Sequence, residues 1–284
     1  MPNVLITGGL GYVGSHLVEQ LKKTNNEITL LIRESDKEHR IGKEFRLVTI
    51  EELEKNPENL MINTVVNLAG KYSFDHQVVG VSELLLSNVV LPARVAAAVS
   101  GVGVQVQWVQ ASTFMQHYKG ADRAPTCFYA STKQSAEDVL HWFESEDFRV
   151  TSLVLPHIFG EEDPRDKLIN LLLRSVKSGN RIQLSSGTQV MDMVYINDIT
   201  KAIEMVLLDK GPAGRWQITS GKAIRVAEIV EYIRSTSGNA LNVQFDESLD
   251  RAMDCYELWL NAPILPNWTA SKELFSWLST RLAS

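Results

Sequence analysis

Tyr129 and Lys133 are the residues of this sequence best suited to proton transfer. The segment 128–144 that holds them has helical periodicity, and a spacing of four places both side chains on one helix face. A nearby ammonium group stabilises a phenolate and so lowers the pKa of a tyrosine. A tyrosine tuned in this way can protonate a carbonyl oxygen or accept the proton of a hydroxyl. The spacing also arises by chance, but among the seven tyrosines only Tyr129 has a lysine four residues after it.

Two hydroxyl side chains, Ser112 and Thr113, lie at the carboxyl end of the strand segment 107–113, which continues the predicted strand 104–109 and precedes this helix. Open α/β sheets bind their ligands at the carboxyl ends of the strands. A hydroxyl at this point can therefore hydrogen-bond a substrate oxygen that it shares with Tyr129. The alternative is that the hydroxyl only caps a local turn, and we expect this for one of the two residues.

A glycine-rich loop at residues 7–14 lies between the first predicted strand and the first predicted helix. Glycines at every third position allow a tight turn and let a diphosphate approach the backbone. The free N–H groups at the helix start then face the phosphates. This context favours a dinucleotide site, although a tight turn without a ligand is the alternative. The residues expected to line the site are Gly8, Gly11, Tyr12, Val13 and Gly14.

The end of the second predicted strand selects between the two nicotinamide cofactors. An acidic residue at this point would bind the ribose 2′-hydroxyl of NADH, whereas an arginine accommodates the 2′-phosphate of NADPH. Arg33 occupies the position, so the sequence favours NADPH. The alternative places Arg33 in solvent and Glu34 on the ribose, which would favour NADH.

The elements that must position these residues alternate between apolar strands and helices. Strands are predicted at 4–7, 28–32, 65–69, 104–109 and 150–155, and helices at 14–23, 82–100 and 128–144. This order predicts an α/β fold over residues 1–160, with a doubly wound parallel sheet of the Rossmann type. Short strands at 179–194 and helices at 167–177, 198–208, 225–235 and from about 271 predict a smaller α/β lobe over 161–284, interleaved with the first domain.

Composition limits the class of protein. The 284 residues are 44% hydrophobic and 22% charged with a net charge of −6, which is typical of a globular chain and disfavours nucleic-acid binding. The two cysteines, Cys127 and Cys255, fit no metal or disulfide spacing, so we expect no metal and a reducing, cytoplasmic location. We find no basic leader and no apolar run near the roughly 18 residues that span a membrane, and therefore expect no membrane partner.

The order of these motifs resembles the extended branch of the short-chain dehydrogenase/reductase superfamily, the NAD-dependent epimerase/dehydratase family. Nearly the whole chain takes part in the resemblance. Residues 7–14 match the family's opening, 67–70 the turn after its fourth strand, Asn88 a helix asparagine, and 155–160 and 194–198 two later segments. The runs 129–134 and 184–189 are most similar to nucleotide-linked 4-keto-6-deoxyhexose reductases of the CDP-paratose and CDP-abequose synthase type.

The resemblance implies an enzyme that uses NADPH to reduce the C4 ketone of a nucleotide-linked sugar, most commonly as a homodimer. Thr113 then becomes the catalytic hydroxyl with Ser112 as its supporting neighbour, Tyr129 the acid, and Lys133 the residue that tunes it and holds the nicotinamide ribose. The segment 95–99 either lines the dimer interface or lies buried against the sheet. The other residues expected at the cofactor are Asn67, Leu68, Ala69, Gly70, Pro156 and Ile158.

Departures from the family pattern bear on the substrate. Phe114 and Met115 follow the catalytic threonine where dehydratases of this branch carry Asp-Glu, which argues against elimination of water. Met191 stands where the family often has an arginine that binds the nucleotide phosphates. Arg251 aligns roughly with a second phosphate-binding arginine, and Arg181 is a further candidate.

Other functions share parts of this pattern. A nucleotide-sugar 4-epimerase with bound NAD has the same fold, but Arg33 and the short chain argue against it. A protein that only senses NADP(H) would typically lack the Tyr–Lys pair. A reductase of a free small ketone stays open because of Met191. His157 replaces an asparagine of the family, and it either bonds the sugar or is structural.

Overall fold

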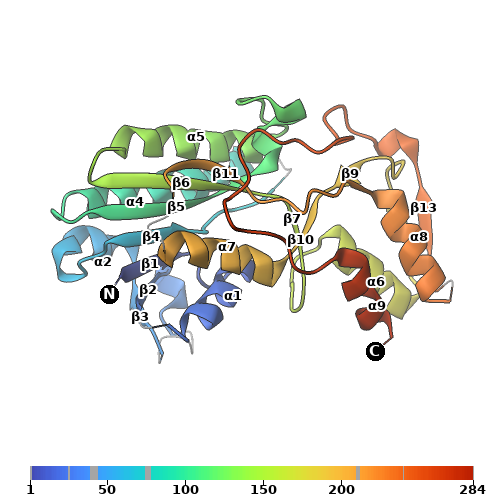
Figure 1. The fold of residues 1–284 in the computed structure, drawn as a ribbon, viewed down its shortest axis with the longest axis horizontal. Coiled ribbons are helices and arrows are strands. Elements are labelled where there is room, and N and C mark those ends of the chain that lie inside the picture. Colours follow the sequence, from blue (N-terminus) through green and yellow to red (C-terminus); the bar gives the residue numbers. More distant parts are fainter. Residues whose placement is uncertain are drawn as a thin grey trace.

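A parallel sheet of seven strands forms the centre of the molecule, and a smaller lobe lies at one end of it (Figure 1). The computed structural model describes residues 2–24, 26–38, 44–73, 78–208, 212–238 and 240–283. The strand order reverses direction between β1 and β4, which confirms the predicted Rossmann-type sheet. In spatial order the strands are β3 (Arg46–Val48), β2 (Glu27–Leu31), β1 (Asn3–Thr7), β4 (Thr64–Asn67), β5 (Val106–Thr113), β6 (Phe148–Leu155) and β11 (Gly214–Gln217).

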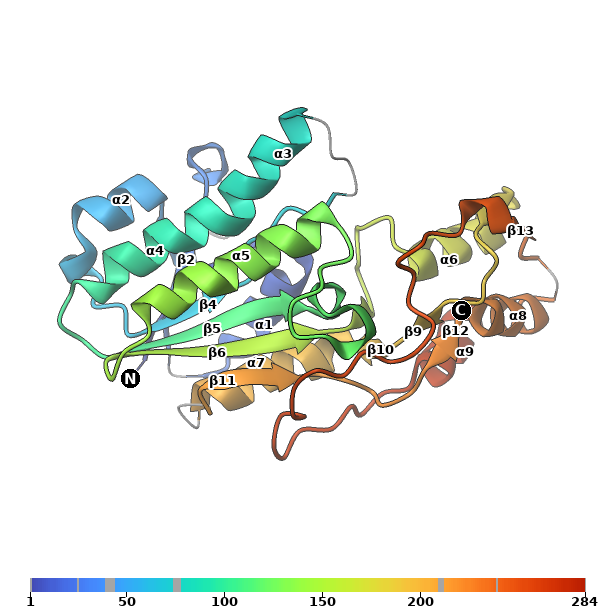
Figure 2. The ribbon, with the colours of Figure 1, turned by 90° about the horizontal axis from the view of Figure 1, so that it is seen from above.

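Helices cover both faces of the sheet because the central strands are apolar on both sides. Leu5 and Val65 belong to a core shared with one helix layer, and their neighbours Ile6 and Val66 belong to the core on the other face. Figure 2 shows the two layers from above. The first layer holds α2 (Ile50–Lys55), α3 (Val78–Leu85), a π-helical turn (Leu86–Val90), α4 (Leu91–Ser100) and α5 (Phe128–Phe143), and the second holds α1 (Tyr12–Leu21) and α7 (Ile196–Leu208).

The smaller lobe packs three helices around short two-stranded sheets. Its core contains Trp277 of the last helix, and α7 and β11 return from this part of the chain to the large sheet. The lobe helices are α6 (Leu168–Ser178), α8 (Val226–Thr236) and α9 (Leu274–Leu282). Its strand pairs are β7 (His157–Phe159) with β10 (Met193–Tyr195), β8 (Ile182–Leu184) with β13 (Val243–Phe245), and β9 (Val190–Met191) with β12 (Ile224–Arg225).

The expectation that no apolar segment is long enough to span a membrane is wrong for a helix of the first layer. The continuous helix Gly80–Ser100 has 21 residues and is long and apolar enough to span a membrane by length and composition. Such a helix is also common in protein cores, and here α4 packs beside α2 and α5 on the sheet. Val95, Ala96 and Val99 are buried, so these members of the segment 95–99 face the sheet.

Candidate functional site

The glycine-rich loop forms a closed turn between β1 and α1. The Gly11 N–H donates to the Gly8 carbonyl oxygen at 2.9 Å, and Gly8 has a φ of +69° that favours glycine. A Cβ at Gly14 would lie 2.1 Å from the Gly8 oxygen, so only glycine lets the helix start this close to the strand. A Cβ at Gly11 would meet only that oxygen, at 3.2 Å, and otherwise no heavy atom of the described chain within 4 Å. The outer side of the loop is therefore open, as a bound diphosphate requires.

Buried polar side chains join the loop to the neighbouring strands. The Thr7 hydroxyl donates to Asn67 Oδ1 at 2.5 Å and accepts the Ala69 N–H at 3.1 Å. Asn67 Nδ2 donates to Gln110 Oε1 at 2.8 Å, which also accepts from Trp108 Nε1 at 3.1 Å. Asn67 is 1% exposed. Its side chain thus fixes the ends of β1, β4 and β5 relative to one another, while the backbone of 68–70 follows the strand at the edge of the site.

Asn88 fastens the segment after β4 to α5. It lies in the π-helical turn, accepts the Lys71 N–H at 2.7 Å, and donates to the Lys71 carbonyl and the Thr132 hydroxyl at 3.0 and 2.9 Å. A Cβ at Gly70 would lie 3.3 Å from Asn88 Oδ1 and 3.9 Å from Lys133 Nζ. The lysine ammonium therefore reaches the turn after β4, as a residue that holds a nicotinamide ribose must.

Tyr129 and Lys133 lie on α5 as predicted, but the pKa of Tyr129 shifts in the direction opposite to the expected one. Burial raises the pKa of Tyr129 above its ordinary value, with Tyr72 and Cys127 adding to the rise and the Arg165 charge opposing it. Burial also lowers the pKa of Lys133 to about 8, although the Glu137 charge opposes this shift. The expected lowering of the tyrosine pKa by Lys133 is therefore not found: burial raises the pKa, and the charge that opposes this rise is that of Arg165.

The two hydroxyls at the end of β5 have different surroundings. Thr113 begins a short turn: its hydroxyl accepts the Met115 N–H at 3.4 Å, and its own N–H donates to Gln116 Oε1 at 3.0 Å. Ser112 is 3% exposed and donates a hydrogen bond to the Glu137 carboxylate of α5. Ser112 therefore joins the strand to the helix through its hydroxyl, and its expected substrate contact stays a prediction.

His157 lies at the start of β7 beside Phe114. The ring centroids are 4.6 Å apart, and the His157 N–H donates to the Asp192 carbonyl at 3.0 Å. Burial, with a contribution from the Lys167 charge, lowers the pKa of His157 to about 4, so the ring is neutral at pH 7. Its Nδ1 is buried without a hydrogen-bond partner among the described residues. Pro156 and Ile158 flank it between β6 and the lobe.

Cationic side chains from the lobe reach the neighbourhood of Tyr129. Lys167 Nζ lies 3.4 Å from the ring centroid of Tyr72, and the Tyr72 ring meets Tyr129 edge-on at 4.9 Å. Burial lowers the pKa of Lys167 to about 8. Burial and the neighbouring Cys127 raise the pKa of Tyr72 to about 12, and the charge of the predicted Arg251 opposes this rise, so it acts on the same ring. Lys167 and Tyr72 could not be predicted as site residues from the sequence, because only the fold brings their segments to α5.

The other two predicted arginines are exposed. Arg33 follows β2 at the expected strand end, its side chain is 85% exposed, and its Nε is 3.0 Å from Asp36 Oδ2. Arg181 directly precedes β8 and is exposed on the lobe. The charge of Arg251 thus acts on a ring beside Tyr129, whereas the substrate role of Arg181 stays a prediction.

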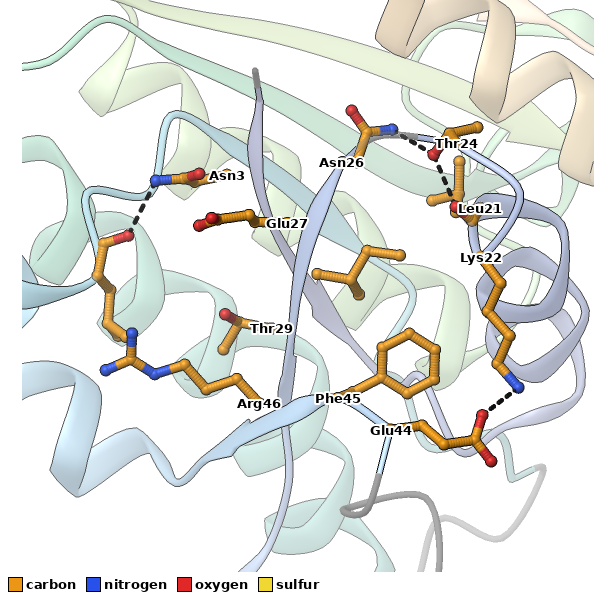
Figure 3. A pocket seen from close by; sticks show the side chains of 12 residues that line it. Asn3, Leu21, Lys22, Thr24, Asn26, Glu27, Thr29, Glu44, Phe45 and Arg46 are labelled. Atoms are coloured by element: carbon orange, nitrogen blue, oxygen red, sulfur yellow. Dashed lines mark hydrogen bonds and ion pairs between the residues drawn. The ribbon is translucent and has the colours of Figure 1, made fainter.

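An open pocket lies at the opposite, amino-terminal edge of the sheet (Figure 3). It is lined by polar and charged side chains such as Asn3, Lys22 and Glu27 around the starts of β1 and β2. Parallel sheets bind ligands at the carboxyl ends of their strands, so this pocket does not belong to the site. No group of three or more His, Cys, Asp or Glu side chains in the described part of the chain is placed to hold a metal ion.

Known proteins resemble this chain along most of its length. A family model described as "NAD dependent epimerase/dehydratase family" matches residues 4–218. CDP-abequose synthases of Salmonella muenchen and Yersinia pseudotuberculosis are 24% and 26% identical over 94% and 84% of this chain, and over 92% and 86% of their own lengths. The structure of Thermus thermophilus UDP-glucose 4-epimerase with NAD has a TM-score of 0.79 and 21% identity, covering 99% of this chain and 97% of that one.

Proposed function

Because this chain belongs to the NAD-dependent epimerase/dehydratase family, we propose that it is an NADPH-dependent reductase of the C4 ketone of a nucleotide-linked 4-keto-6-deoxyhexose. A ketone gains a hydride at carbon and a proton at oxygen in such a reaction. The bound cofactor supplies the hydride. The protein must supply the proton, hold the substrate and stabilise the charge that develops on the oxygen.

The surroundings of Tyr129 carry this proposal. Burial is the largest cause of its raised pKa, and the side chains that add to or oppose this shift are Tyr72, Cys127 and Arg165, none of which is a carboxylate. The raised pKa keeps the phenol protonated at neutral pH, which suits a proton donor. Phe114 and Met115 stand where an elimination would need acidic groups. Reduction needs one proton donor and no second base, so these residues favour a reductase over a dehydratase.

The remaining residues suit a nucleotide-linked substrate and a dinucleotide. Thr113 ends β5 next to α5, where its hydroxyl would donate a hydrogen bond to the ketone oxygen. Lys167 and Arg251 offer positive charge for a substrate diphosphate, which offsets the absence of an arginine at Met191. Similarity to CDP-abequose synthases supports a sugar substrate. Arg33 supports NADPH, since its guanidinium is exposed at the expected strand end. The homodimer and the cytoplasmic location stay predictions.

The test is to follow oxidation of the reduced cofactor by its near-UV absorbance. NADPH and NADH are offered separately, each with CDP-, dTDP- and GDP-linked 4-keto-6-deoxyhexoses. Oxidation of NADPH with one of these sugars supports the proposal and identifies the nucleotide. If the protein binds NADPH but oxidises it with none of these sugars, the proposal is refuted. A parallel assay with free small ketones separates the alternative without a nucleotide.

A nucleotide-sugar 4-epimerase is the second candidate, favoured by the similarity to the Thermus thermophilus 4-epimerase along the whole chain. An epimerase retains its NAD and returns the hydride to the opposite face of the sugar. Denaturing the purified protein and analysing the released nucleotide distinguishes the two, because a reductase exchanges its cofactor freely.

A further inference from the structure

Arg165 is a cation that the sequence motifs do not single out, and it packs on the ring of Tyr12, which follows Gly11 of the glycine-rich loop. Its guanidinium carbon is 4.4 Å from the ring centroid of Tyr12, the residue after Gly11. Tyr12 is buried and begins α1. The segment between β7 and α6 that carries Arg165 therefore reaches across from the lobe to the expected diphosphate site.

This guanidinium is held in a defined orientation. Asp163, whose side chain is only 3% exposed, accepts from Arg165 Nε at 2.7 Å and from Nη2 at 2.8 Å. Asn170 of α6 fixes the same segment by donating to the Asp163 and Arg165 carbonyls at 3.0 and 2.8 Å. An arginine clamped in this way loses little conformational entropy when it binds a further anion.

The clamp leaves donors free. A guanidinium has five N–H donors, and the Asp163 carboxylate occupies one on Nε and one on Nη2. The donors that remain have no partner among the described residues, and the side chain is 34% exposed. Planar guanidinium groups bind phosphate oxygens through such paired donors.

The position of the charge agrees with a ligand that passes between the loop and α5. Burial raises the pKa of Tyr12 and that of Tyr129, and the Arg165 charge opposes the rise at both residues, so this charge acts at both ends of the site. A dinucleotide whose diphosphate lies on the glycine-rich loop must cross this interval to bring its nicotinamide to Tyr129. We propose that Arg165, clamped by Asp163 and stacked on Tyr12, binds the diphosphate of the dinucleotide cofactor as a side-chain complement to the backbone of the loop. The proposal rests on the use of a dinucleotide, which is part of the proposed function.

The test measures binding by calorimetry rather than turnover. Wild-type protein and Arg165→Ala are titrated with NADPH, with ADP-ribose, which keeps the diphosphate but lacks nicotinamide, and with CDP, which stands for a substrate diphosphate. Loss of a charge-assisted contact of this kind is expected to weaken NADPH and ADP-ribose by about ten-fold or more, with CDP changed less than two-fold. Arg174→Ala is the matched control, because Arg174 lies on α6 in an exposed ion pair with Asp166. This variant should leave the affinities for all three ligands unchanged.

Two results would overturn the inference. ADP-ribose binding to Arg165→Ala within two-fold of wild type excludes a diphosphate contact, and a loss confined to CDP assigns Arg165 to the substrate instead. If Arg165→Ala does not fold because Asp163 is left buried without its partner, the double variant Asp163→Asn/Arg165→Gln keeps a neutral hydrogen-bonded pair and is titrated in its place. A wild-type protein that binds no dinucleotide refutes the proposed function itself, and is thus distinguishable from a failure of Arg165 alone.

Discussion

Alanine substitutions at two glycines of the loop should separate folding from cofactor binding. At Gly14 the added Cβ would lie 2.1 Å from the Gly8 oxygen and 2.7 Å from the Gly9 Cα, and these are backbone atoms that cannot turn aside. The first turn of α1 must then move away from β1. We expect Gly14→Ala to lower the free energy of unfolding by about 3 kcal/mol, the upper end of the usual cost of overpacking.

Gly11→Ala should behave differently because its Cβ would meet only one atom, the Gly8 oxygen at 3.2 Å. Gly11 precedes α1 with an extended backbone, φ −80° and ψ 174°, which alanine adopts without strain. Its cost to stability should stay below about 1 kcal/mol, the scale of an N-cap substitution. The added methyl group would, however, stand on the open side of the loop. A steric overlap between this methyl group and the diphosphate that costs about 1.4 kcal/mol weakens dinucleotide binding ten-fold. We expect the NADPH affinity to fall by at least this factor.

Urea unfolding followed by circular dichroism gives the two stabilities, and titration with NADPH gives the affinities. The expected pattern is a large stability loss for Gly14→Ala alone and an affinity loss for Gly11→Ala with nearly normal stability. Equal stability losses in the two variants would contradict the contact geometry of the loop. An unchanged NADPH affinity in Gly11→Ala would contradict the assignment of its outer side to the diphosphate.

Four further variants test the site. Tyr129→Phe should lower the turnover number by about 100- to 10,000-fold, as for a lost general acid, with NADPH affinity unchanged by titration; a smaller loss would exclude Tyr129 as the proton donor. Arg251→Ala should raise the Michaelis constant for the nucleotide sugar about ten-fold or more if the arginine binds a phosphate, and an unchanged constant would favour a free ketone substrate. The pKa of His157 is about 4 in the folded protein and about 6.5 in the unfolded chain. The free energy of unfolding should therefore fall as the pH drops from 6.5 to 4, by up to about 3 kcal/mol. A series of unfolding curves at different pH values should show a shallower fall for His157→Asn. Glu137→Gln should cost about 2 kcal/mol in the same assay, because the buried carboxylate accepts from Ser112, Gln116 and the partly exposed Arg215; no loss would mean that these contacts contribute little.

Local sequence pattern predicted the elements whose formation depends on neighbouring residues. The apolar runs of β1, β4 and β6 lie where their periodicity indicates, and the spacing of Tyr129 and Lys133 places both on α5. The strand β11 was not predicted, because the sequence Gly-Arg-Trp-Gln has no apolar alternation and forms a strand only by pairing with β6. The short strand β3 was not predicted either, because its structure depends on its pairing with β2.

The charges and pairings of the site were decided by the tertiary structure. Helical spacing predicted that Lys133 lies near Tyr129, but the direction of both pKa shifts follows from burial, which depends on elements far apart in the chain. Lys167 meets Tyr72, and Arg165 meets Tyr12, only because the lobe folds back over the carboxyl edge of the sheet. Sequence by itself therefore determined the Rossmann-type sheet, the glycine-rich loop and the Tyr–Lys pair, because propensity, periodicity and spacing act between near neighbours. Desolvation and contacts across the lobe act between distant segments, and for this reason the tertiary structure alone decided the direction in which each pKa shifts and what each group touches.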